Sequence, residues 1–320
     1  MLLRFVFLMF SAGTMLGAGA GFGQDYPNKP VRIVTAEGGG GADFMSRLIA
    51  QGLTVSLGQQ VVVENRGGAS GAIAAQAVAK APADGYTLLF YSNGIWTLPL
   101  LRDVPYDPVK DFAPLTLVAI SPNMIVVHPS LPVRSVKQLI ALAKARPGEL
   151  NYSMGGTGTT PHLAAELFKS MAGVDIVRIN YKGAGPALNE LIGGQVQLTF
   201  ATTASGMPHV KSGRLKALAV TSAEPSALVP GLPTVAASGL PGYESVASYG
   251  MFSTARTPAA LVSRLNEEIV RVLRRAEVKE KLFNTGVEVV GGSPEGFAAM
   301  MKMEMLKWGK VIRDAGIRGE

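Results

Sequence analysis

Cysteine is absent from the chain, and this absence excludes disulfide bonds, thiolate chemistry and lipidation at an N-terminal cysteine. Histidine is scarce, with three residues in unrelated contexts. His162 and Glu166 are one helical turn apart, a spacing that suits two metal ligands, but no third ligand stands nearby. A simple contact on a helix surface is the favoured interpretation, and we predict no metal site.

The motifs of common hydrolases and nucleotide-dependent enzymes are also missing. No Gly-Lys-Ser/Thr sequence closes a phosphate-binding loop, and Ser70 within Gly68–Gly71 lacks the spacing of a nucleophile elbow. No pair of carboxylates suited to acid–base catalysis can be identified. We predict a protein that is not an enzyme and that uses no cofactor.

Charge is sparse and dispersed. Charged residues make up 17% of the chain, the formal net charge is +7, and the densest basic cluster, Arg271, Arg274 and Arg275, fits the solvated face of a helix. No basic patch interleaved with aromatic residues is present, so nucleic acid is not an expected partner. Because 48% of the 320 residues are hydrophobic, there is enough apolar material for two packed cores.

Residues 1–24 are predicted to be a signal peptide. Arg4 supplies the positive charge, Phe5–Leu16 is largely apolar, and Ala18-Gly19-Ala20 has the small-residue spacing of a cleavage site. The apolar run is too short to favour a membrane anchor. An exported protein of the bacterial periplasm is therefore expected.

The most informative stretch is Val31–Arg47, in which an apolar run is followed by Gly38–Gly41 and then by a helical pattern. This order predicts a strand, a tight loop and a helix. Bare backbone N–H groups and a helix N-terminus then point at one spot, which suits an anion. Glycines that only permit a tight turn are the alternative.

The same arrangement recurs in the second half of the chain. Asn151–Phe168 is again a predicted strand, glycine loop and helix, with Thr160 as the expected N-cap and Pro161 as the first helical residue. Two more pairs of segments correspond in order, namely 61–72 with 176–187 and 85–93 with 194–203. Since ligands bind at the C-terminal ends of parallel strands, the repeat predicts two lobes facing each other across a cleft.

We predict an α/β fold of two lobes, with two doubly wound sheets joined by two crossing strands. Leu115–His128, broken at Ser121-Pro122, and Tyr243–Ser253 are the expected crossings. The first lobe would then comprise residues 25–120 and 246–320, and the second lobe residues 121–245. Two C-terminal helices, beginning near Thr257-Pro258 and Ser293-Pro294, are expected to pack on the first lobe.

The strongest enzyme alternative is a dinucleotide-binding domain, because Glu64 follows the first glycine loop at about the spacing of that fingerprint, roughly 20 residues. Asp43 stands where that fingerprint needs a small residue, and its charge would repel a pyrophosphate. This alternative is disfavoured.

The motifs together resemble the substrate-binding proteins of tripartite tricarboxylate transporters, the Bug or TctC-like family. The resemblance is carried by VVVENRGGASGAIAAQAVAKAPADGYTLL, PYDPVKDFAPLT, GTGTTPHLAAELFK, YKGAGPALNELIGGQV and HVKSGRLKALAVTS, and it covers nearly all of the mature chain. It implies a two-lobed periplasmic-binding-protein fold of the type II kind. It also implies a periplasmic protein, expected to be a monomer, that closes on a small organic carboxylate and presents it to a membrane permease. A partner that presents the ligand to a sensor is the alternative role.

The resemblance also implies which residues bind the ligand. In this family backbone N–H groups and bridging waters of the cleft loops hold the carboxylate. The residues that match these loops are Gly39, Gly40, Ala42, Asp43, Ser92, Asn93, Gly156, Thr157, Gly158, Thr159, Tyr181, Lys182, Gly183, Ala184, Thr202 and Thr203. We expect Asp43 to have a structural role as a helix cap.

Departures from the family pattern bear on the ligand. Ala201 and Ala42 stand where the family commonly has an acidic residue and a threonine, so a ligand ammonium would lack partners and an amino acid is disfavoured. Met154 and Trp96 either line an apolar wall that suits an aromatic or aliphatic carboxylate or are ordinary packing residues.

Overall fold

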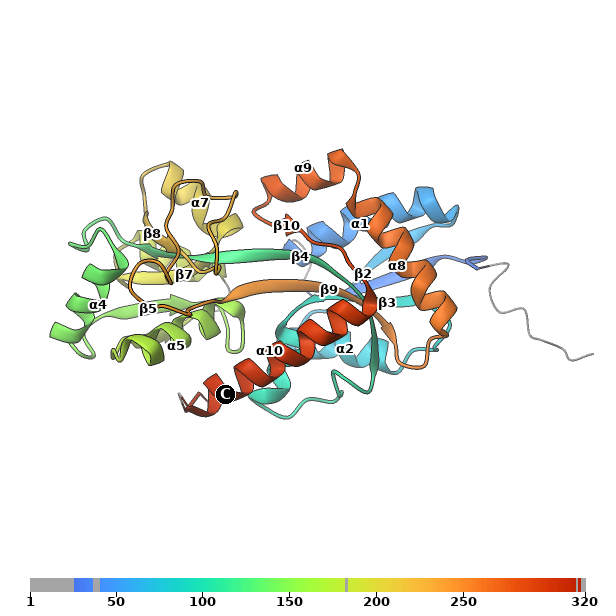
Figure 1. Ribbon diagram of the computed structural model, residues 1–320, viewed down its shortest axis with the longest axis horizontal. Coiled ribbons are helices and arrows are strands. Elements are labelled where there is room, and N and C mark those ends of the chain that lie inside the picture. Colours follow the sequence, from blue (N-terminus) through green and yellow to red (C-terminus); the bar gives the residue numbers. More distant parts are fainter. Residues whose placement is uncertain (1–25, 37–40, 182–183, 315, 318–320) are drawn as a thin grey trace, which may run out of the picture.

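One strand, β4 (Phe112–Val127), runs through both halves of the molecule in this computed structural model, which describes residues 26–36, 41–181, 184–314 and 316–317. Along Phe112–Pro122 it pairs with β9 (Val246–Thr254), and along Asn123–Val127 it pairs with β7 (Leu198–Thr202) and β8 (Lys216–Val220). The first predicted crossing is therefore confirmed as an extended segment. Figure 1 shows the two α/β bodies that β4 and β9 join.

The predicted break at Ser121-Pro122 does not occur, because the strand continues through it. Pro122 has no N–H to give to a ladder, and it lies where β4 exchanges β9 for β7 and β8. The next residue, Asn123, donates its backbone N–H to Thr221 Oγ1 at 2.8 Å. This exchange of partners lies close to residue 121, which we keep as the proposed limit of the second lobe.

The remaining elements follow the predicted order. In the first lobe they are β1 (Val31–Thr35), α1 (Gly41–Leu57), β2 (Val61–Asn65), η1 (Ala69–Gly71), α2 (Ala72–Ala79), β3 (Thr87–Ser92), α3 (Gly94–Thr97), η2 (Leu98–Leu100), α8 (Ala259–Leu273), α9 (Ala276–Asn284), β10 (Glu288–Val289) and α10 (Pro294–Asp314). In the second lobe they are α4 (Val136–Ala145), β5 (Asn151–Met154), α5 (Thr160–Ala172), β6 (Val177–Asn180), α6 (Ala184–Ile192) and α7 (Thr203–Lys211), with β7 and β8.

The internal repeat is visible in the order of the strands. In the first lobe the parallel strands lie in the order β2-β1-β3, and in the second lobe in the order β6-β5-β7. Each repeat therefore places its first strand between the other two, and the strand that ends in a glycine loop is central in both. This arrangement brings the predicted loops to corresponding edges of the two sheets.

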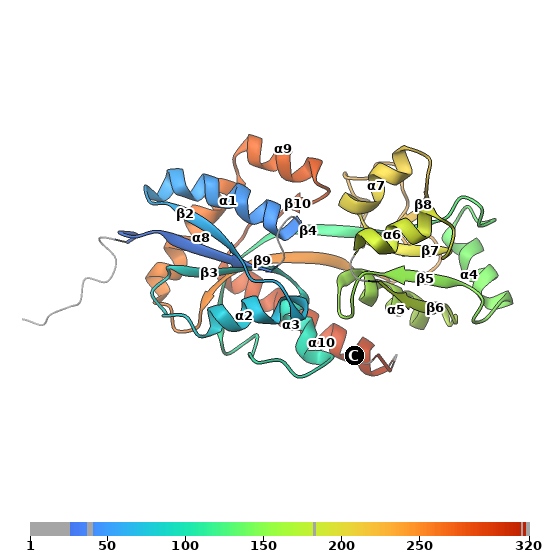
Figure 2. The same cartoon turned by 180° about the vertical axis from the view of Figure 1, so that it is seen from behind.

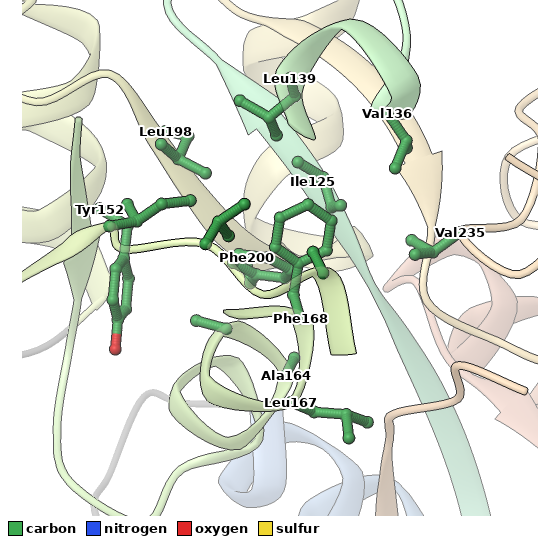
Figure 3. Close-up of a cluster of buried hydrophobic side chains, with 14 of the residues drawn as sticks. Ile125, Val136, Leu139, Tyr152, Ala164, Leu167, Phe168, Leu198, Phe200 and Val235 are labelled. Atoms are coloured by element: carbon green, nitrogen blue, oxygen red, sulfur yellow. The ribbon is translucent and has the colours of Figure 1, made fainter. Parts of the chain in front are cut away.

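Separate apolar cores hold the lobes together. The second-lobe core contains Ile125, Phe168 and Phe200, which lie close together in Figure 3, with the Phe168 and Phe200 ring centroids 5.6 Å apart. The first lobe has apolar layers on both faces of its sheet, one around Ile33 and Leu265 and one around Trp96. Burial of these side chains is the main stabilising contribution to each lobe.

The C-terminal helix α10 does not pack on the first lobe alone, as the sequence had suggested. Its N-terminal half buries Phe297 and Met301 beside Trp96, whereas Trp308 and Ile312 belong to the core of the second lobe. Figures 1 and 2 both show α10 extending from the first lobe toward α5. Apolar residues at both ends of one long helix therefore connect the two lobes. Among the described residues, no helix combines the length and the apolar character needed to cross a membrane.

Glu304 is a titratable residue in the middle of α10, where this helix connects the two lobes. Its carboxylate accepts hydrogen bonds from Trp96 Nε1 at 2.8 Å and from Ser248 Oγ at 3.4 Å. Burial raises the pKa of Glu304, and Glu244 adds to this, while the Trp96 hydrogen bond and Lys307 act in the opposite direction.

A carboxyl group whose pKa is raised by folding stabilises the folded state below its unfolded pKa, and this contribution is lost as the pH rises through the folded pKa. As the pH rises from 4.5 to 7, we expect the free energy of unfolding to fall less in Glu304→Gln than in the unmodified chain. Urea unfolding at several pH values measures this difference. Glu280→Gln is the control, because Glu280 is exposed and its substitution removes the same charge. Parallel pH profiles for Glu304→Gln and the unmodified chain would contradict this prediction.

Candidate functional site

A cavity of about 180 Å³ lies between the lobes and is lined by residues from both. From the first lobe these are Ser70, Tyr91, Ser92, Gly94, Leu98, Ala247 and Tyr249, and from the second lobe Thr157, Gly158, Thr159, Thr160, Pro161 and Thr202. Most of them carry hydroxyl groups, and none of these lining residues carries a charged side chain. The cavity therefore offers neutral hydrogen-bond donors and acceptors.

The wall from the second lobe is the start of helix α5. Thr159 is the N-cap residue, and Thr160 and Pro161 form the first turn. The N-terminal end of a helix carries unpaired backbone N–H groups and a partial positive charge, so this wall favours an anion. The opposite wall includes Tyr249, whose hydroxyl is a neutral group that can donate a hydrogen bond; burial raises its pKa further above the ordinary value.

The N-cap lies one residue earlier than the predicted Thr160. The Thr160 hydroxyl is engaged elsewhere, because it donates a 3.0 Å hydrogen bond to Asn93 Oδ1 of the first lobe. The Thr159 hydroxyl donates to the Gly156 carbonyl at 2.8 Å and so closes the loop before the helix. Asn93 and Thr160 are both buried, and their hydrogen bond ties the two sides of the site together.

The sixteen predicted ligand-binding residues fall into three groups. Those that line the cavity are Ser92, Thr157, Gly158, Thr159 and Thr202. Those that lie outside the described residues, and for which binding stays a prediction, are Gly39, Gly40, Lys182 and Gly183. Those that are described but do not line this cavity are Ala42, Asp43, Asn93, Gly156, Tyr181, Ala184 and Thr203.

Residues of the third group support the site or lie beside it. Asp43 is buried in the first turn of α1, and its carboxylate accepts from Asn65 Nδ2 at 2.9 Å and from Arg47 Nε at 3.1 Å. These hydrogen bonds link α1 to the end of β2, and the role of Asp43 as a helix cap stays a prediction. Thr203 is buried and donates to the Gly286 carbonyl at 2.7 Å.

The other members of this group are near the cleft loops. Ala42 is half-buried beside the first-lobe core, and Ala184 is exposed at the start of α6. Tyr181 donates its backbone N–H to the Met154 carbonyl at 2.9 Å, directly after β6. Gly156 lies in the loop that Thr159 closes.

His162 is buried, and the expected contact with Glu166 on a helix surface is wrong. The backbone N–H of Gly158 donates to His162 Nδ1 at 3.1 Å, and Arg178 Nη1 lies 3.2 Å from Nε2. Glu166 instead accepts from the Tyr152 hydroxyl at 2.5 Å. No group of three potential metal ligands occurs among the described residues. His162 supports the backbone of the cavity wall, a role that the spacing alone did not indicate.

Trp96 and Met154 do not line the cavity. Both are fully buried, Trp96 against Phe252 and Phe297 and Met154 within the second-lobe core. They are ordinary packing residues, which was one of the two interpretations of the sequence. The lining residues that sequence reasoning missed include Ser70, Tyr91 and Tyr249. The only signal for Ser70 was its place in a run of small residues.

Comparisons with known proteins agree with this architecture. Residues 45–317 match the family model described as tripartite tricarboxylate transporter family receptor. The chain is 36% identical to protein BugT of Bordetella pertussis over 297 residues, which cover 92% of this chain and 91% of that protein.

Two solved structures extend the comparison. The structure of R. palustris Rpa4515 with adipate matches with a TM-score of 0.84 at 40% identity, covering 92% of this chain and all of that one. MatC from Rhodopseudomonas palustris with bound malate matches with a TM-score of 0.79 at 29% identity, covering 90% and 100%. The resemblance and the two-lobed α/β fold predicted from the sequence are confirmed.

Proposed function

The chain belongs to the tripartite tricarboxylate transporter receptor family, and we propose that it captures a small organic carboxylate between its lobes and delivers it to the membrane permease of such a transporter. The observation that carries this proposal is the cavity between the lobes, where the start of α5 faces hydroxyl groups of the first lobe. Relatives with adipate and malate support the ligand class.

Binding in this cavity requires no chemical step. Backbone N–H groups and hydroxyls replace the water around a carboxylate, and closure of the lobes excludes the remaining solvent. The Asn93–Thr160 hydrogen bond joins the two lobes beside the cavity, and we propose that it is kept while the lobes close. We infer that the protein acts as a receptor without catalysis.

The family is one of periplasmic receptors, and we propose that residues 1–24 of this chain direct export and are removed. The mature protein is proposed to act as a monomer, because one chain supplies both walls of the cavity. Membership of the family supports the proposed permease partner, and measurement of transport in cells would test it.

The ligand class is tested by a thermal-shift screen of the mature chain, refolded to strip bound ligand. The panel contains mono-, di- and tricarboxylates, aromatic acids, amino acids, sugars and NAD. A ligand at about 100 times its dissociation constant adds roughly 2.7 kcal/mol, which corresponds to a shift of a few degrees. Shifts confined to carboxylates are expected, and shifts with sugars or NAD alone would overturn the proposal.

A further inference from the structure

A second cavity, of about 420 Å³, lies on the other side of strand β9 from the cavity between the lobes. Val246 and Ser248 of β9 line it. The residues that alternate with them, Ala247 and Tyr249, line the cavity between the lobes. Because successive residues of a strand point to opposite faces, the two cavities lie back to back across β9. We call the second cavity, which β4, β9 and α10 enclose, the rear pocket.

The middle of α10 forms one wall of the rear pocket. This helix is held in the first lobe by Phe297 and Met301, and in the core of the second lobe by Trp308 and Ile312. The space under the middle of the helix therefore depends on the angle between the lobes. Closing the lobes bends the molecule toward the face of β9 that carries the first cavity, and this motion widens the rear pocket on the opposite face.

Much of the surface of the rear pocket is apolar. Leu117 and Ile120 of β4 and Met300 of α10 contribute to it, and the exposed Met303 lies beside them on α10. The aliphatic chain of a small ligand would lose contact with water on entering this pocket, and burial of apolar surface favours binding.

The charge of the rear pocket is negative. Its charged side chains, among the residues that the structure describes, are Glu244, Glu304 and Lys307. Lys307 Nζ lies 3.4 Å from Glu244 Oε2, so these two charges balance each other. Glu304 accepts hydrogen bonds from two neutral groups, Trp96 Nε1 and Ser248 Oγ, and burial raises its pKa. A cation beside Glu304 would offset the cost of burying its carboxylate.

We propose that the rear pocket binds a small aliphatic ammonium ion, with the ammonium group beside Glu304 and the chain against β4 and α10, and that this occupant strengthens binding in the cavity between the lobes. The occupant fits best where the pocket is widest, so it favours the closed form. Coupling between two sites is reciprocal, so a bound carboxylate also strengthens binding of the ammonium ion. The coupling rests on the proposed function, whereas the ammonium site does not.

The site is tested with hexylammonium, by isothermal titration calorimetry on the mature chain. The neutral analogue of equal length is 1-hexanol, and hexylammonium should bind about tenfold or more tightly than this alcohol. Glu304→Gln keeps the shape of the side chain and removes its charge, so it should abolish the preference. Glu280→Gln removes the charge of an exposed residue outside the pocket and should leave the preference unchanged.

A variant that fills the rear pocket gives an independent test. Val246→Phe places a ring in the pocket from the β9 side, so it should prevent binding of hexylammonium, and circular dichroism checks that the variant is folded. Equal affinities of the unmodified chain for hexylammonium and 1-hexanol would overturn the site. Undiminished binding of hexylammonium by both Glu304→Gln and Val246→Phe would also overturn it.

The coupling is tested by titrating adipate with and without saturating hexylammonium. If adipate does not bind, the carboxylate with the largest thermal shift in the screen replaces it. Hexylammonium should lower the dissociation constant of the carboxylate about fivefold or more in the unmodified chain. The same addition should have no effect in Glu304→Gln. An unchanged or higher dissociation constant in the unmodified chain would show that the coupling is wrong.

The outcomes separate this inference from the proposed function. If carboxylates bind but hexylammonium does not, the ammonium site is wrong and the proposed function stands. If hexylammonium binds through Glu304 while no carboxylate of the screen binds, the ammonium site stands, and the proposed function fails together with the coupling. If neither binds, both proposals fail.

Discussion

Gly158→Val is expected to raise the dissociation constant for the carboxylate ligand by about a hundredfold or more while the protein remains folded. Gly158 lines the cavity with a φ of 78°, a value that a β-branched residue adopts only with strain. A Cβ atom there would lie 3.0 Å from Leu101 Cδ1 and 3.4 Å from Leu98 Cδ1. The side chain would therefore press against the first lobe.

The mechanism of this effect differs from simple filling of an anion site. To relieve the contact, the loop must move away from Leu98 and Leu101, and it carries Thr157 and Thr159 with it. Loss of two hydrogen bonds to a charged ligand, at about 1.5 to 3 kcal/mol each, accounts for a hundredfold change. Gly40→Val is expected to act at the other glycine loop on sequence grounds alone, since Gly40 lies outside the described residues.

The control is Gly173→Val at the other end of the same helix. Gly173 is the C-cap of α5 with a φ of 59°, and nothing lies within 4 Å of its Cβ position. The variant carries similar backbone strain but does not touch the cleft. Calorimetric titration should show near-normal affinity for Gly173→Val, and circular dichroism checks the folding of both variants. Unchanged affinity in Gly158→Val would remove this loop from the site.

The sequence was most informative where local pattern determines structure. The glycine loops, the strands before them and the helices after them predicted the repeat, and the structure shows the same strand order in both lobes. The cap of α4 is a local feature of the same kind, because the Gln138 N–H donates a 3.3 Å hydrogen bond to Ser135 Oγ within one turn. Elements of this kind need no distant partner.

Features that depend on distant contacts could not be predicted from the sequence. The sequence Thr159-Thr160-Pro161 allows either threonine to be the N-cap, and the choice is made by Asn93, 67 residues away. Helix α9 and strand β10 were not predicted. The two residues of β10 are a strand only because they pair with Ile120 and Ala119 of β4.

The side chains that face the cavity also could not be predicted from local sequence. Ser70 and Tyr249 come from segments far apart in the chain, and only the folded first lobe brings them to one wall of the cavity. The two ends of α10 carry apolar residues alike, so the pattern predicted a buried helix but not that Trp308 would enter the core of the second lobe. Periodicity indicates which face of a helix is buried but does not identify the surface that covers it.

His162→Ala is expected to weaken ligand binding about tenfold and to lower the free energy of unfolding by roughly 2 to 3 kcal/mol. The ring is fully buried, and its Nδ1 accepts the backbone N–H of Gly158 at 3.1 Å. Removing it leaves a cavity and an unpaired buried N–H group, so the Gly158 loop loses the contact that fixes its position. Urea unfolding and calorimetric titration measure the two effects separately.

Two further variants test whether the hydrogen bond, and not the volume of the ring, is responsible. The side-chain oxygen of asparagine reaches the place of Nδ1, whereas glutamine reaches that of Nε2. His162→Asn should therefore recover much of the lost affinity, and His162→Gln should not. If His162 positions a backbone group and binds no metal, chelators should leave the affinity of the unmodified chain for its ligand unchanged. Equal recovery by asparagine and glutamine would mean that His162 acts through packing, and chelator sensitivity would reopen the metal interpretation.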